Sequence, residues 1–138
     1  MLVAYVSFNG NTEEAFNFYK SALGGNITNV QRFGDSPDGG QMADADKEKI
    51  MHIALEAPAG IRLIGNDHLE FMGGPSMAGN NFSLSLHPDS KEVADKLFAN
   101  LSAGGDSYSS DEQSTLGDYF GMFTDKFGIK WMINKAAG

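Results

Sequence analysis

The chain has 138 residues, 41% of them hydrophobic, which is long enough for one compact domain with its own core. Its formal charge of −8 disfavours nucleic acid and anionic membranes as partners, because both are bound through clustered Lys and Arg. The absence of cysteine excludes disulfides, thiolate metal sites and a cysteine nucleophile, and it favours a cytoplasmic location. No apolar run approaches the roughly 20 residues that span a bilayer, and no signal peptide is expected.

The first half of the chain reads as a strand, a helix and three further strands. Residues Leu2–Phe8 are apolar and β-prone, and a turn follows them. A helix is predicted to begin at Asn11, which forms a capping-box variant with Glu14, and to end at Gly24-Gly25. Its apolar face has helical spacing and consists of Ala15, Phe18, Tyr19, Ala22 and Leu23. The later elements are strands at Ile27–Phe33, Ile50–Ala57 and Ile61–Gly65, an exposed loop at 34–49 and a turn at 58–60.

The same order begins again in the second half. A strand is predicted over Phe82–Leu86, and the next helix is capped by Asp89 with Glu92 and ends at Gly104-Gly105. The apolar face of this helix consists of Ala94, Leu97, Phe98 and Leu101. Three more strands are predicted at Ser107–Glu112, Tyr119–Thr124 and Ile129–Asn134.

The two halves match in pattern, with Ala15 on Ala94 at an offset of 79 residues. A repeat of this length indicates two structural modules rather than a solenoid. We therefore predict a single α+β domain of two βαβββ modules, at 1–66 and 80–138, joined by a linker at 67–79. One helix covers only one face of four strands, so the other faces are expected to form a curved mixed sheet around a small-molecule cavity.

The order of elements, with Phe18-Tyr19-Lys20 before Leu23-Gly24-Gly25, resembles the vicinal oxygen chelate superfamily, which contains glyoxalase I, extradiol dioxygenases and bleomycin-resistance proteins. The chain is more similar still to the PhnB-like branch, often labelled a demethylubiquinone methyltransferase domain. Four stretches carry this closer resemblance: Phe8–Asn11 before Glu13–Ala15, Ile50–His52, Gly79–Asn81 before Ser83–Leu86, and Phe123–Gly128 before Trp131–Asn134.

The resemblance implies a divalent metal held by the first and last strands of each module. The corresponding positions are Ala4, Leu63, Asn81 and Met132. Alanine and leucine cannot ligate a metal, and methionine sulfur is too soft for Mg, Mn or Fe(II). His52 and Glu56 share a strand face but lie about 13 Å apart, too far to share one ion. We therefore expect no metal or other cofactor.

Candidate ligand contacts lie on the faces expected to line the cavity. Asn81, Ser83 and Ser85 form the polar face of one strand, for which simple solvent exposure is the alternative. His52 could act as a general base or orient a ligand carbonyl, or it could be a histidine without chemistry. Aromatic and sulfur side chains could line an apolar pocket or pack in the core: Phe120, Trp131 and Met132. Arg32 and Arg62 could face an anionic ligand or solvent.

These features predict a cytoplasmic homodimer that binds a small organic molecule of unassigned identity between its modules, without the usual metal. A metal-dependent glyoxalase, lyase or dioxygenase is the alternative, and metal-free acid–base catalysis by His52 is another. Methyl transfer, which the branch label implies, is not supported, because no G-x-G stretch follows a strand. Whether the modules pair within one chain or across a dimer stays open.

Overall fold

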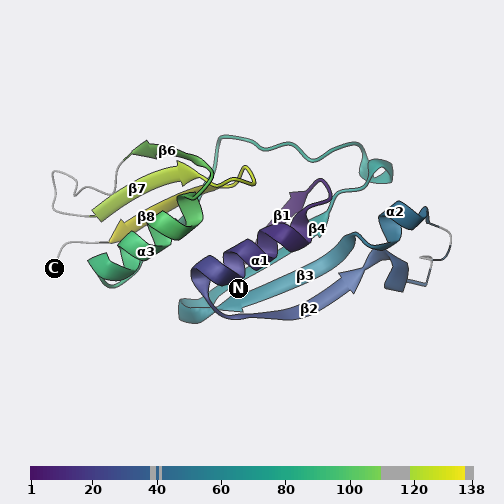
Figure 1. The fold of residues 1–138 in the computed structure, drawn as a ribbon, viewed down its shortest axis with the longest axis horizontal. Coiled ribbons are helices and arrows are strands. Elements are labelled where there is room, and N and C mark those ends of the chain that lie inside the picture. Colours follow the sequence, from purple (N-terminus) through teal and green to yellow (C-terminus); the bar gives the residue numbers. More distant parts are fainter. Residues whose placement is uncertain (38–39, 41, 110–118, 136–138) are drawn as a thin grey trace. The chain divides into compact units, whose positions relative to one another are not determined.

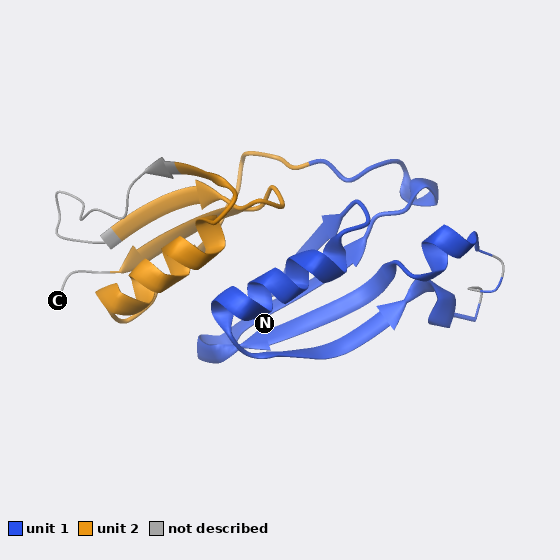
Figure 2. Ribbon diagram, in the orientation of Figure 1, with its two compact units in different colours: residues 1–77 blue, residues 78–138 orange. Residues whose placement is uncertain are grey.

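The computed structural model describes residues 1–37, 40, 42–109 and 119–135. It divides into two compact units, Met1–Met77 and Ala78–Gly138 (Figure 2). Each unit holds one four-stranded sheet and one long helix, which confirms the predicted pair of βαβββ modules (Figure 1). Within the described residues, every helix is too short or too polar to cross a bilayer.

Unit 1 contains a sheet in the order β1-β4-β3-β2, in which β1 and β4 are parallel and the other neighbours antiparallel. Its main elements are β1 (Ala4–Phe8), α1 (Thr12–Leu23), β2 (Asn26–Arg32), β3 (Ile50–Ala57) and β4 (Ile61–Asp67). Its short helical segments are η1 (Phe33–Asp35), α2 (Asp44–Lys47), η3 (Pro58–Gly60) and η4 (Glu70–Met72). The loop predicted at 34–49 therefore contains a helical turn of its own.

Unit 2 repeats this topology, with the order β5-β8-β7-β6 and a parallel β5–β8 pair. Its elements are β5 (Leu84–Leu86), α3 (Lys91–Ser102), β6 (Asp106–Ser109), β7 (Tyr119–Thr124) and β8 (Lys130–Lys135). The first strand is shorter than predicted, because Phe82 precedes the ladder with β8 and is 70% exposed. The predicted strand end at 110–112 lies outside the described residues.

Each long helix packs on one face of its sheet. The prediction placed Phe18 in the core, but Phe16 is fully buried there and Phe18 only partly. The ring of Phe16 lies over Gly65 of β4, where a Cβ atom would collide with it. Phe98 of α3 lies over Gly121 of β7 in the same way. The helix-covered faces are therefore shaped by aromatic rings that fit against strand glycines.

The predicted helix caps are only partly right. Asn11 is the N-cap residue of α1, as predicted, but it makes no side-chain capping bond, and the buried carboxylate of Asp67 takes that place. Oδ1 of Asp67 accepts from the backbone N–H groups of Gly10 and Thr12, both at 3.0 Å, and from Oγ1 of Thr12 at 2.6 Å. In unit 2 the cap is Ser90, one residue after the predicted Asp89, and its Oγ accepts from the backbone N–H of Val93 at 3.1 Å.

The internal repeat is present in the structure as well. The two long helices begin 79 residues apart, at Thr12 and Lys91. Shortly after the end of each helix in the chain, a Cβ atom on Gly25 or Gly105 would collide with a backbone carbonyl of the neighbouring strand. Each unit therefore needs a glycine where the chain passes from helix to strand.

Candidate functional site

The face of the unit 1 sheet that α1 leaves uncovered carries a row of polar side chains. Ser7 pairs with Asn66 across β1 and β4, and Gln31 pairs with His52 across β2 and β3. The antiparallel β3–β4 register begins with Ile53 opposite Gly65, and its continuation by one residue would bring His52 opposite Asn66. Directly opposite residues have Cβ atoms about 5 Å apart. Ser7, Asn66, His52 and Gln31 thus form one continuous line across four strands, here called the polar row.

The polar row presents hydrogen-bond donors. Ser7 Oγ donates to Asn66 Oδ1 at 2.6 Å, which fixes the carboxamide and leaves its Nδ2 hydrogens for another acceptor. His52 is partly exposed, and its imidazole has no hydrogen-bond partner among the described residues. One imidazole nitrogen carries a hydrogen in every tautomer, so His52 can always donate.

An apolar strip and an ion pair flank the polar row on the same face. Tyr5, 57% exposed, pairs with Ile64 across β1 and β4. Two residues before Ile64 on β4, Arg62 Nε lies 3.8 Å from Glu56 Oε1. The carboxylate of Glu56 therefore faces an arginine rather than His52. A ligand on this face would meet donors on one side and apolar surface beside them.

The uncovered face of unit 2 is chemically different. Met132 of β8 lies opposite Ser85 on one side and Met122 on the other, and Phe120 lies opposite Asn134. The predicted contacts Met132 and Phe120 thus share a strand face, while α3 covers the other one. Methionine and phenylalanine give this face a deformable apolar centre.

The other three predicted contacts are one core residue and two residues that precede β5. Trp131 alternates with Met132, is 1% exposed, and its Nε1–H donates to Asp125 Oδ2 at 2.8 Å. It is a core residue of unit 2, and the candidate site does not include it. Asn81 is exposed and Ser83 partly buried, and both precede β5 rather than belonging to it.

The positions implied for a metal do not fit a hard divalent ion. Ala4 and Leu63 pair with each other on the helix-covered face, where Leu63 is 4% exposed, so the implied assignment is one residue out of register. Tyr5 and Ile64 take their places on the uncovered face and offer a phenol and an alkyl group. Among the described residues, His, Asp and Glu nowhere gather in groups of three that could hold an ion. The donor set therefore does not match the metal centre of the superfamily's enzymes.

Ser7, Asn66 and Asp67 are functional or framework residues that were not predicted. The predicted strand ends at Gly65, which leaves Asn66 after the strand and Asp67 in the linker. The available signal was alternation, since Ile64 and Asn66 continue one face beyond the glycine.

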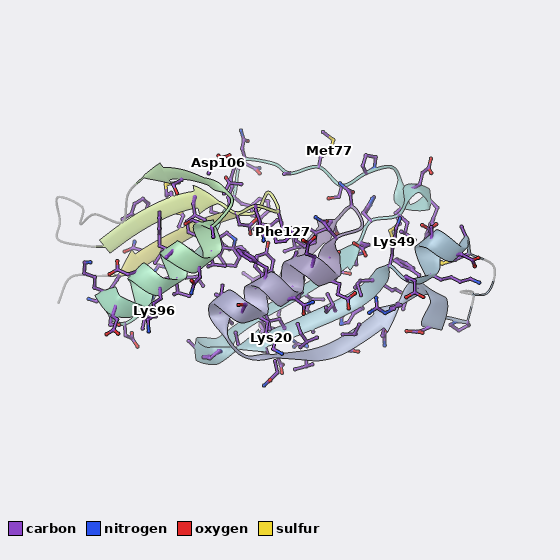
Figure 3. All side chains as sticks on the ribbon, in the orientation of Figure 1. Lys20, Lys49, Met77, Lys96, Asp106 and Phe127 are labelled. Atoms are coloured by element: carbon purple, nitrogen blue, oxygen red, sulfur yellow. The ribbon has the colours of Figure 1, made fainter. Side chains whose placement is uncertain are left out.

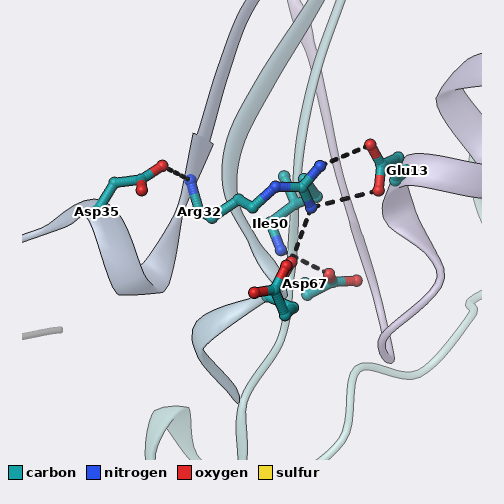
Figure 4. Close-up of polar contacts among 6 residues, drawn as sticks. Glu13, Arg32, Asp35, Ile50 and Asp67 are labelled. Atoms are coloured by element: carbon teal, nitrogen blue, oxygen red, sulfur yellow. Dashed lines mark hydrogen bonds and ion pairs between the residues drawn. The ribbon is translucent and has the colours of Figure 1, made fainter. Parts of the chain in front are cut away.

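Arg32 is part of the framework rather than of a ligand site (Figure 4). Its guanidinium donates to both carboxylate oxygens of Glu13, at 3.2 and 2.8 Å, and to the backbone carbonyl of Glu48 at 2.8 Å. The hydrogen bond to Glu13 raises the pKa of Arg32 above its already high ordinary value. These bonds tie the end of β2 to α1.

Comparison with known proteins agrees with the observed fold. The family model described as 3-demethylubiquinone-9 3-methyltransferase matches residues 1–134. Protein YjdN of Escherichia coli K12 is 31% identical over 137 residues, which is 96% of this chain and 93% of YjdN. The crystal structure of PA1353 from Pseudomonas aeruginosa is 37% identical, with a TM-score of 0.86 over 100% of this chain and 98% of that one.

More distant structures share the fold. A PhnB protein from Bacillus cereus has a TM-score of 0.78 at 21% identity, with 98% of each chain covered. A glyoxalase/bleomycin resistance/dioxygenase family enzyme from Burkholderia phytofirmans has a TM-score of 0.63 at 18% identity, with 96% of this chain and 97% of that one covered. These two structures share the fold of this chain. The match over residues 1–134 and the relative at 31% identity show that the chain belongs to the 3-demethylubiquinone-9 3-methyltransferase family.

Proposed function

We propose that this protein binds a small organic molecule against the uncovered faces of its sheets, without a divalent metal. The polar row of unit 1 carries this proposal. It joins a fixed carboxamide, Asn66, to an imidazole, His52, that has no described partner, and an apolar strip lies beside both. Apolar surface with a few placed polar groups is typical of small-molecule sites. The cavity between modules stays a prediction of the sequence.

The proposed contacts in unit 2 are Met132 and Phe120, with Ser83 and Asn81 before β5. In unit 1, His52 would orient a ligand oxygen or accept a proton. Turnover is not part of the proposal. The family name does not bring methyl transfer to this chain, since the sequence lacks the glycine-rich turn that a nucleotide-derived methyl donor would use.

We also propose a homodimer in the cytoplasm. Large apolar side chains are exposed along the segment that follows β4 and precedes β5, and Figure 3 labels one of them, Met77. The exposed fractions are 70% for Phe71, 89% for Met77 and 70% for Phe82. Large apolar side chains exposed to this extent favour association with another surface, here a second copy of the chain. The absence of cysteine supports a reducing compartment.

Native mass spectrometry of freshly purified protein tests these points together. We expect a dimer that carries an organic mass and no stoichiometric metal. The His52→Ala variant should lose the bound mass, while Asn17→Ala on the exposed side of α1 should keep it. Stoichiometric metal, or a ligand retained equally by both variants, would contradict the proposal for this site. A monomer at micromolar concentration would contradict the dimer alone.

A further inference from the structure

One buried atom on the uncovered side of unit 1 lacks a partner. Among the described residues, Nδ1 of His68 is the one buried side-chain nitrogen or oxygen without a hydrogen bond. The backbone N–H of His68 donates to the carbonyl of Phe8 at 2.6 Å, which holds His68 beside β1 directly after the last residue of β4. If the alternation of β4 is continued by one residue, the His68 side chain falls on the same face as Asn66. Buried polar atoms almost always have a partner, so this position indicates a missing group.

His68, Asn66 and His52 are neighbours on that face. The continued β3–β4 register sets His52 across from Asn66, and His68 follows Asn66 by two residues, directly after the end of β4 and about 7 Å along the chain. We call these three residues the donor cluster. Ser7 already occupies Oδ1 of Asn66, so the carboxamide presents N–H groups to the space between the imidazoles.

The carboxylates near the donor cluster are engaged elsewhere. Asp67 points to the opposite face and accepts from Gly10, Thr12 and Ile50. Glu56 lies beside Arg62. The cluster therefore has hydrogen-bonding groups that neither Asp67 nor Glu56 satisfies. The Asn66 Nδ2 hydrogens are donors, and in the tautomers that direct an N–H of each imidazole to the same space the cluster favours a ligand that brings an acceptor.

Building on the proposed function, we infer that the donor cluster binds a carbonyl oxygen of a ligand whose ring lies against Tyr5 and Ile64. Those two side chains form the apolar strip next to the cluster, and Tyr5 is 57% exposed. The ligand class is therefore a ring-bearing ketone, aldehyde or amide. A buried water would satisfy His68 but would leave the apolar strip without a role.

Two small probes of similar size test the inference by ¹H–¹⁵N NMR titration. Acetophenone carries only an acceptor, and benzylammonium carries only donors. We expect acetophenone to bind with a Kd of about millimolar, as small fragments do, and to shift the Asn66 side-chain amide and the adjoining backbone signals of β1, β3 and β4. Benzylammonium should bind about tenfold more weakly, because two hydrogen bonds would be absent.

The Asn66→Asp variant replaces the donor with an acceptor, keeps the shape and keeps an oxygen for Ser7. It should reverse the preference, while the matched Asn17→Asp variant on α1 should not. Ser7→Ala frees the carboxamide to rotate and should reduce the preference, which gives a second test if Asn66→Asp does not fold. Equal binding of both probes, or an unchanged preference in Asn66→Asp, would overturn the inference and leave the proposed function standing. If neither probe shifts signals from either uncovered face, the proposed function fails too.

Discussion

The carboxylate of Asp67 accepts the hydrogen bonds at the start of α1. The replacement of Asp67 by asparagine is therefore the most informative stability test. Asp67 is 1% exposed and lies at the end of β4. Oδ1 accepts three hydrogen bonds from Gly10 and Thr12, and Oδ2 accepts one from the backbone N–H of Ile50 at 2.8 Å. One side chain thus joins three segments that are far apart in the sequence.

Asparagine can preserve only one side of this arrangement. With its oxygen toward Thr12, its NH₂ group faces the N–H of Ile50, and one buried donor loses its acceptor at a cost of about 2 kcal/mol. The three bonds that remain are weaker because the acceptor is no longer charged. The opposite orientation removes three bonds instead of one and is worse. We expect Asp67→Asn to lower the free energy of unfolding by about 3 kcal/mol, which for a chain of this size lowers Tm by about 10 °C.

Urea unfolding followed by far-UV circular dichroism measures this change. The matched control is Asp44→Asn, because the Asp44 side chain is 99% exposed, and its stability should stay within about 0.5 kcal/mol of the parent. Replacing a buried charge can also stabilise a protein when the cost of removing that charge from water dominates. A variant as stable as the parent would mean that desolvation outweighs the four hydrogen bonds, and our reasoning would be refuted.

Three further predictions concern the framework around the two faces. In Asp125→Asn, the one remaining oxygen is expected to keep the backbone N–H groups of Phe127 and Ile129, so that an NH₂ group faces the Trp131 indole. The emission of the chain's one tryptophan should then shift, and unchanged emission would contradict the observed bond. Gly25→Ala should lower Tm clearly in a thermal melt, because φ is +90° and the added Cβ meets a backbone carbonyl, whereas Gly40→Ala, with open space, should not. Arg32→Met should lower the free energy of unfolding in urea by about 1 kcal/mol or less, because the paired side chains of Arg32 and Glu13 are 32% and 51% exposed. The difference from the parent should become smaller in 1 M salt. A large loss that does not depend on salt would argue against a surface ion pair.

The fold was largely predictable because its strongest signals are local. A helical stripe, a terminal glycine pair and a strand of alternating residues each extend over a short window, and their recurrence at an offset of 79 residues revealed the duplication. The caps were not predictable in this way. Asp67 caps α1 from 55 residues away, so no window around Asn11 contains the information.

The candidate site was predictable only in part, for a related reason. Alternation within one strand correctly separated His52 from its buried neighbour Ile53. It could not say which strands lie beside β3, and so it could not bring Asn66 and Ser7 next to the imidazole. Trp131 shows the same limit, because its role becomes clear only once Asp125 is seen to accept its N–H.

The duplication separates what holds each unit together from what each unit presents. On the helix-covered sides, the two units pack in the same way, with Phe16 over Gly65 and Phe98 over Gly121. The uncovered faces share no such constraint, and they differ, with hydrogen-bond donors in unit 1 and methionine with phenylalanine in unit 2. Substitutions there should therefore change binding with little effect on stability, whereas helix-side substitutions should do the reverse. Under the proposed function, recognition would therefore depend on residues other than those that stabilise each unit.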